Sequence, residues 1–210
     1  MTAKLELVIG TGNRGKGREL AELLAPVGLQ LATLADFPQA IDVLENGDTF
    51  AANAALKATQ QARHLGRWVL ADDSGLAVDA LAGAPGVLSA RYSGPAATDA
   101  SNNRLLLERL EGLAAEQRAA RFVCHMTLAD PAGVVRAESE SYCRGQITLA
   151  PRGPYGFGYD PLFEIAEYHR TFGELGVAVK SCLSHRARAV RRLIPALLAL
   201  VDSGAWAGEL

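Results

Sequence analysis

The stretch "LELVIGTGNRGKGRELAELLAPVG", residues 5–28, has the pattern of a strand, a glycine-rich turn and a helix. Its first part is a short apolar run that ends in glycine, which is typical of a buried strand. After the turn, Leu20, Leu23 and Leu24 recur at helical spacing, and Gly28 is a suitable C-terminal stop. We therefore expect a strand–turn–helix unit here, and the residues of its turn are the first candidates for a ligand site.

The turn matches two phosphate-binding patterns incompletely. Gly10, Gly12 and Gly15 satisfy the dinucleotide fingerprint, and the run from Gly10 to Lys16 nearly satisfies a P-loop. Backbone amides at the start of a helix attract anions, and Lys16 adds a full positive charge. A P-loop has Ser or Thr after its lysine to bind magnesium, whereas Gly17 supplies no oxygen. The turn thus predicts a phosphate site without a strict Walker motif; the alternative is a tight turn with a solvated lysine.

Further elements follow from periodicity and turn residues. Thr49 is a suitable cap for an Ala-rich helix that ends at Gly66, and Pro195 is expected to kink or divide the terminal helix. The other expected elements are strands at 29–34 and 67–71, a helix at about 98–110, an antiparallel hairpin of 121–130 with 134–143, and an irregular segment at 150–163. This order predicts an α/β fold with a mixed sheet.

Composition limits the class of protein. The chain has 210 residues, 49% of them hydrophobic, which suffices for one large domain or two lobes. A net charge of −2 and a pI near 6.1 argue against binding along nucleic acid. Cys124, Cys143 and Cys182 form neither a zinc pattern nor a disulfide framework, and no signal peptide or membrane span is evident. We expect a soluble, cytoplasmic protein.

The segment "ADDSGL", residues 71–76, places two carboxylates next to an apolar strand, at its expected end. Burial of charge without a partner is expensive, so Asp72 and Asp73 are candidates to bind a hard cation. Magnesium usually lies between one or two carboxylates and substrate phosphates. Glu45, in an acidic loop, is a candidate for a further carboxylate. The alternatives are a polar turn capped by Asp, and a surface position for Glu45.

The segment "GFGYDP", residues 156–161, sets one aromatic ring between two glycines. Phe157 has little local backbone to pack upon, which favours an exposed ring that stacks on a base. The alternative is an aromatic residue that fills the edge of a core.

The segment "KSCLSHRARA", residues 180–189, carries Lys180, His185 and Arg186 near the start of a helix. These cations suit a phosphate or a purine carbonyl. The alternative is a solvated basic helix face.

Taken together and in order, five segments resemble the inosine triphosphate pyrophosphatase family of RdgB type, the dITP/XTP pyrophosphatases. They lie at residues 11–16, 49–58, 71–94, 156–161 and 180–189. The resemblance implies one pyrophosphatase domain over residues 1–210, with an elongated, two-lobed, mixed-sheet α/β fold around a cleft, usually in a homodimer. It also implies Mg²⁺-dependent hydrolysis of dITP, ITP and XTP to the monophosphate and pyrophosphate, which keeps deaminated purines out of DNA and RNA.

The resemblance also assigns roles to residues. It makes Asp73 the general base and a metal ligand, Glu45 the second metal ligand, and Asp72 and Lys16 further members of the catalytic group. The substrate-binding residues that it implies are Thr11, Gly12, Asn13, Arg14, Gly15, Lys16, Lys57, Ser74, Phe157, Gly158, Tyr159, Asp160, Lys180, His185 and Arg186. The chain has Leu44, Ala52 and Val179 where the family commonly has acids.

Three other functions remain open at this point. A non-catalytic purine nucleotide sensor would bind without turnover, and a related phosphohydrolase would release orthophosphate. An NAD-dependent oxidoreductase would use the glycine fingerprint together with Asp36, which lies about 20 residues beyond it, where a ribose-binding acid belongs.

Overall fold

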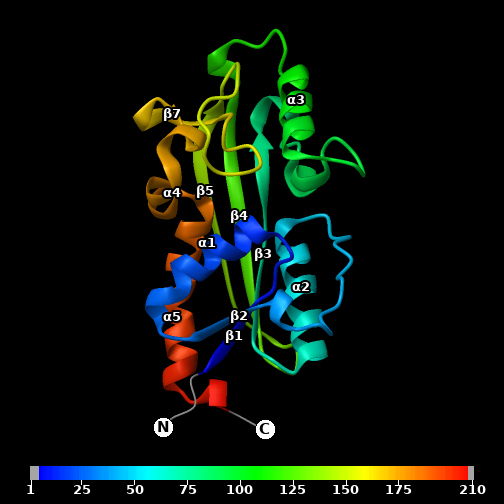
Figure 1. Ribbon diagram of the computed structural model, residues 1–210, viewed down its shortest axis with the longest axis vertical. Coiled ribbons are helices and arrows are strands. Elements are labelled where there is room, and N and C mark those ends of the chain that lie inside the picture. Colours follow the sequence, from blue (N-terminus) through cyan, green and yellow to red (C-terminus); the bar gives the residue numbers. More distant parts are fainter. Residues whose placement is uncertain (1–4, 208–210) are drawn as a thin grey trace. The chain divides into compact units, whose positions relative to one another are not determined.

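The computed structural model describes residues 5–207, which form two compact units (Figure 1). Unit 1 holds the described residues up to Asp73, Cys124–Glu140 and those from Arg188 onward. Unit 2 holds Ser74–Val123 and Ser141–Ala187.

The regular elements are as follows. The strands are β1 (Glu6–Ile9), β2 (Gln30–Thr33), β3 (Val69–Val78), β4 (Ala119–Ala129), β5 (Val135–Ile147), β6 (Phe163–Ile165) and β7 (Arg170–Thr171). The α-helices are α1 (Arg14–Leu24), α2 (Phe50–Leu65), α3 (Asp99–Arg109), α4 (Phe172–Leu183) and α5 (His185–Asp202). Short 3₁₀ helices span Ala25–Val27, Leu34–Asp36, Asp79–Leu81, Gly86–Arg91, Ala115–Gln117, Ala166–Tyr168 and Ala205–Ala207.

Over the described residues the strands form one mixed sheet in the order β2-β1-β3-β4-β5-β6-β7. β1 pairs in parallel with β2 and β3, whereas β6 pairs antiparallel with β5 and β7. β4 and β5 are neighbours joined by a tight turn, in which Asp130 N donates to Val134 O. The expected hairpin and the α/β class with a mixed sheet are confirmed.

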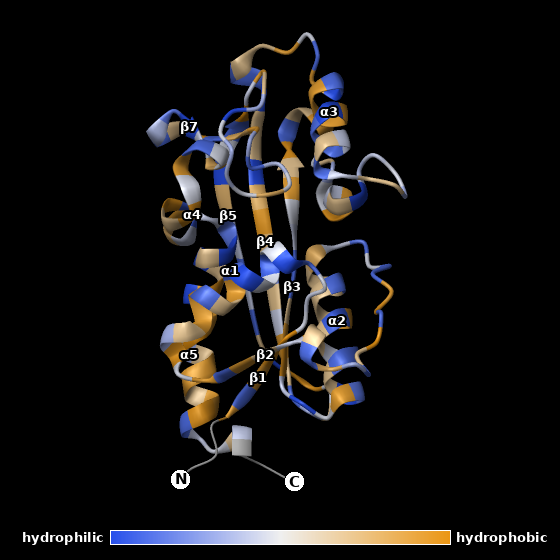
Figure 2. Cartoon of the chain, in the orientation of Figure 1, coloured by the Kyte–Doolittle hydropathy of each residue, from blue (hydrophilic) through white to orange (hydrophobic). Residues whose placement is uncertain are grey.

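In unit 1, helices cover both faces of the parallel strands (Figure 1). Because side chains alternate along a strand, Leu7 and Ile9 of β1 face α1 and α5, while Val8 packs with Ala58 and Ala62 of α2. Orange and blue alternate along α5 in Figure 2, as expected for a helix with one buried stripe. The core of unit 1 thus has two halves, one on each side of the sheet.

Unit 2 has its own apolar core. The rings of Phe122, Phe163 and Phe172 are in mutual contact, with centroids 4.6–6.4 Å apart, and Leu76, from β3, belongs to the same cluster. Leu106 of α3 lies in this cluster as well. Among residues 5–207, no helix is long and apolar enough to cross a membrane.

The expected helix ends are confirmed by their caps. Thr49 Oγ1 accepts a hydrogen bond from Ala52 N at 3.1 Å, and Gly66 closes α2 in the left-handed conformation, with φ of 63°. Gly28 likewise has φ of 82° and follows the last turn of the first helical segment.

Two expectations about element boundaries are wrong. The strand that begins at Val69 continues to Val78, so Asp72 and Asp73 lie inside β3 and not at its end. α5 continues through Pro195, so the expected division of the helix does not occur, while the other expected effect, a kink at Pro195, stays a prediction. Proline removes one backbone donor, but Leu193 and Leu197 on either side of it are fully buried in the unit 1 core, and this packing holds the helix.

α4 was not expected from the sequence. It contains Gly176 with φ of 75° and ψ of 177°, a kink across which two short helices join.

Candidate functional site

The glycine-rich turn joins β1 to α1 in unit 1. Asn13 caps α1, because its Oδ1 accepts from Lys16 N at 3.0 Å, while Asn13 N donates to Thr11 Oγ1 at 3.2 Å. A Cβ on Gly10 would lie 2.7 Å from Val69 Cγ1, so glycine lets β1 approach β3 closely. Gly12 faces open space. The turn is ordered by its own polar groups at the N-terminus of a helix, as a phosphate site requires.

The two adjacent carboxylates on β3 point to opposite sides of the sheet. Asp72 Oδ2 lies 3.6 Å from Lys16 Nζ of α1 and 4.0 Å from Cys124 Sγ, on the side of α1 and α5. Asp73 lies on the side of α2, with Oδ1 3.2 Å from Lys57 Nζ. Both are almost completely buried. The alternation of a strand therefore gives each carboxylate a different lysine from a different helix.

Glu45 and Asp73 contact the same lysine. Glu45 Oε2 lies 2.8 Å from Lys57 Nζ, so the three side chains form a compact group in unit 1. The structure thus brings together the two carboxylates that the sequence analysis proposed as metal ligands, and Glu45 is paired with Lys57 while 34% of its side chain stays exposed.

Asn53 joins this group and was missed from the sequence. Its Nδ2 donates to Asp73 Oδ2 at 3.2 Å, and its Oδ1 accepts from Gly47 N at 2.8 Å. The available signal was its spacing, since Asn53 precedes Lys57 by four residues and both lie on one face of α2.

The charged side chains of this group shift one another's pKa values. Burial raises the pKa of Asp73, and so does the charge of Glu45; together they outweigh the lowering effects of Lys57 and Lys16. Burial lowers the pKa of Lys57, but Asp73, Asp72 and Glu45 outweigh it and the net pKa is raised. Asp72, Asp73 and Glu45 thus lie close to Lys16 and Lys57 in one group of charged side chains.

In unit 2, Asp160 and Lys180 form a buried ion pair, with 2.5 Å between Oδ2 and Nζ. Asp160 Oδ2 also accepts from Phe157 N at 2.8 Å, and Lys180 Nζ lies 4.3 Å from the centroid of the Phe157 ring. Phe157 is half-buried. Its ring is therefore held by a hydrogen bond and a cation–π contact, on a loop that the sequence predicted to be irregular.

The neighbours of Phe157 lie in different surroundings. Gly158 N donates to Asp99 Oδ2 at 2.7 Å. Tyr159 is buried in the unit 2 core, where its hydroxyl donates to Ser89 O at 2.8 Å and burial raises its pKa. The side chain of Tyr159 therefore packs in the unit 2 core, and its expected contact with substrate stays a prediction.

The cations of the 180–189 segment are buried. Lys180, His185 and Arg186 are each at most 5% exposed, so the alternative of a solvated basic face is wrong for them. Arg186 Nη2 donates to Ser74 Oγ at 2.8 Å, and the His185 ring stacks on Phe122 at 4.8 Å. Burial of a guanidinium in unit 2 requires polar partners, and Ser74 is one of them.

Asp36 has a structural role that needs no ribose. Its Oδ2 accepts from Thr33 N at 2.7 Å and from Thr33 Oγ1 at 2.9 Å, which caps the turn after β2 and lowers the pKa of Asp36. Asp36 therefore gives no support to the interpretation of the glycine-rich turn as part of a dinucleotide site.

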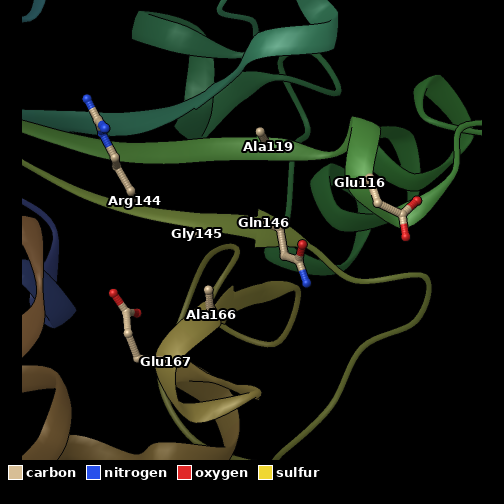
Figure 3. A pocket seen from close by; sticks show the side chains of 7 residues that line it. All are labelled: Glu116, Ala119, Arg144, Gly145, Gln146, Ala166 and Glu167. Atoms are coloured by element: carbon tan, nitrogen blue, oxygen red, sulfur yellow. The ribbon is translucent and has the colours of Figure 1, made fainter.

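Unit 2 also contains a hollow of about 200 Å³ (Figure 3). Among its lining residues, Arg144 comes from β5 and Glu167 from the 3₁₀ helix after β6. Its lining residues are Glu116, Ala119, Arg144, Gly145, Gln146, Ala166 and Glu167, and none of them is a predicted site residue. Two carboxylates beside one guanidinium do not suit a polyphosphate.

Comparisons with known proteins agree over nearly the full length. The Ham1 family profile matches residues 7–196. A dITP/XTP pyrophosphatase of Rhodopirellula baltica is 54% identical over 203 residues, 97% of this chain and 98% of that protein. The corresponding protein of Geobacillus kaustophilus is 52% identical over 188 residues, 90% of this chain and 92% of that protein.

Solved structures agree as well. A HAM1 protein from Coxiella burnetii has a TM-score of 0.84 and 38% identity, with 93% of this chain and 99% of that chain covered. A nucleoside-triphosphatase / dITP/XTP pyrophosphatase from Mycobacterium abscessus has a TM-score of 0.73 and 42% identity, with 90% and 99% covered. The fold, the order of the motifs and these similarities lead to one assignment: this chain belongs to the Ham1 family.

Proposed function

We propose that this chain is a dITP/XTP pyrophosphatase, which hydrolyses dITP, ITP and XTP to the monophosphate and pyrophosphate. The substrate class comes from relatives that carry this name and are about half identical over almost the whole chain. The structural observation that carries the chemistry is the pair of buried carboxylates on β3, each with its own lysine. Such a group has the charges needed to activate water and to stabilise a phosphoanhydride leaving group.

The cofactor that we propose is Mg²⁺, held by Asp73 and Glu45. Both carboxylates approach one point, the Nζ of Lys57, so one cation could contact both of them. Among the described residues, no three His, Cys, Asp or Glu side chains are arranged as a complete metal site. That suits magnesium, which retains waters and takes further ligands from substrate phosphates. When bound, Mg²⁺ would neutralise negative charge on the phosphate oxygens.

The reaction that we propose is in-line attack of water on the α-phosphorus. The water oxygen forms a bond to the α-phosphorus while the bond between the α-phosphorus and the α–β bridging oxygen breaks. One proton of the water goes to Asp73. A carboxylate whose pKa is raised by burial is a better proton acceptor than an ordinary Asp. Lys16 and Lys57 stabilise the departing pyrophosphate, and Asp72 acts by holding Lys16.

We propose a phosphate-binding turn in unit 1 and a base-stacking ring in unit 2. In unit 1, the turn from Thr11 to Lys16 offers helix N-terminal amides to the triphosphate. In unit 2, the purine stacks on Phe157. The family profile covers both units, which supports one functional domain.

Selection of the base depends on hydrogen-bond donors in unit 2. Lys180 and Arg186 are buried donors, and hypoxanthine and xanthine present a 6-oxo acceptor. Adenine presents a 6-amino donor instead, and a site built to hydrogen-bond the 6-oxo group rejects such a base by roughly 10⁴-fold. GTP shares the 6-oxo group, so its exclusion requires contacts at position 2.

The assembly and the location that we propose, a homodimer in the cytoplasm, follow from the family resemblance and the composition. Light scattering on the purified chain measures the first, and fractionation of the source cells the second. A monomer at micromolar concentration would contradict the homodimer.

The test is product analysis with dITP, ATP and GTP in the presence of Mg²⁺, with Asp73→Asn alongside. We expect dIMP and pyrophosphate from dITP, slow turnover of ATP and GTP, and loss of activity in the variant. Release of orthophosphate would identify the related phosphohydrolase, and tight binding without turnover would identify a nucleotide sensor; either result rejects the proposal.

A further inference from the structure

The loop that carries Glu45 is attached to α2 by a row of polar side chains. We call residues 39–48 the Glu45 loop; it contains no helix or strand. The row on α2 consists of Asn53, Lys57, Gln61 and His64. Their spacing of four, four and three residues places them on one face of the helix.

Each member of the row contacts the Glu45 loop. Gln61 is buried and pairs with both the N–H and the carbonyl of Ile41, while His64 Nε2 lies 2.6 Å from Gln39 O. As described above, Lys57 contacts Glu45 and Asn53 contacts Gly47. The loop is therefore fixed along its length by side chains of α2 and not by regular backbone pairing.

Asn53 differs from Gln61 and His64 because it also contacts Asp73. It is 1% exposed, and its two ends have different partners: the Gly47 N–H, which only donates, and the Asp73 carboxylate, which accepts. A carboxamide supplies one acceptor and two donors on one planar group. Neither an aspartate nor an aliphatic side chain at this position offers both to these partners.

The loop packs tightly at this contact. A Cβ on Gly47 would lie 2.8 Å from Asn53 Oδ1 and 2.7 Å from the Cβ of Ala52. The backbone of the loop thus lies directly on the first turn of α2, and any side chain at Gly47 must displace it.

We propose that Asn53 is a positioning residue that fixes the Glu45 loop relative to Asp73, so that Glu45 and Asp73 face the same cation. This inference rests on the proposed function for its metal. Lys57 attracts both carboxylates, but its ammonium is a point charge on a flexible side chain. The planar amide of Asn53, in contrast, fixes the direction and the distance of its two hydrogen bonds, one to Gly47 and one to Asp73. Loss of Asn53 should lower the metal affinity and kcat, and it should raise KM for the nucleotide by a smaller factor.

The experiment uses Asn53→Ala in the full chain, with Asn102→Ala as matched control. Asn102 is also a buried helical asparagine that holds a loop, since its Oδ1 accepts from Ser93 N and its Nδ2 donates to Ser89 O. It contacts no carboxylate through these bonds. The control therefore reproduces the loss of loop contacts without a change beside Asp73.

The first readout is binding of Mn²⁺ alone, followed by electron paramagnetic resonance without nucleotide. Loss of a group that orients a metal ligand typically costs about 10–100-fold in affinity, and we expect this for Asn53→Ala and no more than about threefold for Asn102→Ala. The second readout is steady-state turnover of dITP at varied Mg²⁺, where the Asn53 variant should need more Mg²⁺ and have a lower kcat.

Gly47→Ala is the second variant, should Asn53→Ala fold poorly. It keeps Asn53 and both carboxylates but displaces the loop, so we expect the same weakening of Mn²⁺ binding. Wild-type Mn²⁺ affinity in both variants would overturn the inference. Absence of dITP turnover in the wild type would reject the proposed function, while the Mn²⁺ measurement would still decide the role of Asn53.

Discussion

Replacement of Asp160 by asparagine tests the buried ion pair of unit 2. The Asp160 and Lys180 side chains are only 2% and 7% exposed, and 2.5 Å separates the carboxylate oxygen from the ammonium nitrogen. Asparagine keeps the shape and an acceptor for Phe157 N but removes the negative charge. Lys180 would then remain buried without its nearest carboxylate.

The expected cost follows from this burial. Removal of one partner of a buried pair typically destabilises a protein by about 3–5 kcal/mol, whereas an exposed pair contributes about 0–1 kcal/mol. For a protein of this size, each kcal/mol lowers Tm by roughly 2–4 °C. We therefore expect Tm to fall by about 6–20 °C.

The assays are thermal unfolding, which gives Tm, and urea denaturation at pH 7, in which fluorescence reports the midpoint and the slope. Both are applied to wild type, Asp160→Asn, Lys180→Met and the double variant. Since the double variant has neither charge, its loss of stability should be smaller than the two single losses combined. A change below about 1 kcal/mol for Asp160→Asn, or strictly additive losses, would refute the argument that the pair is buried and coupled.

Four further perturbations have defined outcomes. Asp73→Asn should lower kcat for dITP by about 10²–10⁴-fold, as measured by pyrophosphate release. Chelation of divalent cations should abolish turnover reversibly. A near-normal rate in the first case would contradict the role of Asp73 as base, and in the second case the role of Mg²⁺ as cofactor. Gly75→Ala should destabilise the protein by about 1–3 kcal/mol in the same denaturation assay, because its Cβ would lie 2.3 Å from Ser89 Oγ; an unchanged midpoint would show that the contact relaxes freely. The pKa of Asp130 is lowered, because hydrogen bonds from backbone amides and from Arg136 outweigh the effect of burial. The Asp130 carboxylate therefore stabilises the folded protein at pH values above the pKa of an unfolded Asp. This stabilisation is lost as the pH falls through the lowered pKa of the folded state. Asp130→Asn should therefore flatten the acid side of the stability–pH curve, and a curve identical to wild type would exclude this contribution.

Local signals in the sequence were sufficient for the boundaries of α2. The caps at Thr49 and Gly66 act within one turn of the helix, so their residue types alone predict where the helix begins and ends. The glycine-rich turn was predictable for the same reason.

Contacts between distant segments were not predictable in this way. The strand containing Asp72 and Asp73 was expected to end before them, because two adjacent carboxylates look unsuitable for a strand interior. Lys16 and Lys57, from two separate helices, make that interior position possible. The burial of Arg186 has the same kind of cause, since Ser74 lies 112 residues away in the sequence.

The opposite orientation of Asp72 and Asp73 makes β3 sensitive to a change in chain length. A deletion or insertion of one residue between Val69 and Asp72 would rotate every later side chain of the strand to the other face. The carboxylates would exchange lysines, and the apolar residues on both sides would exchange cores. The stretch from Val69 to Asp73 must therefore keep its length even where its apolar residues are replaced.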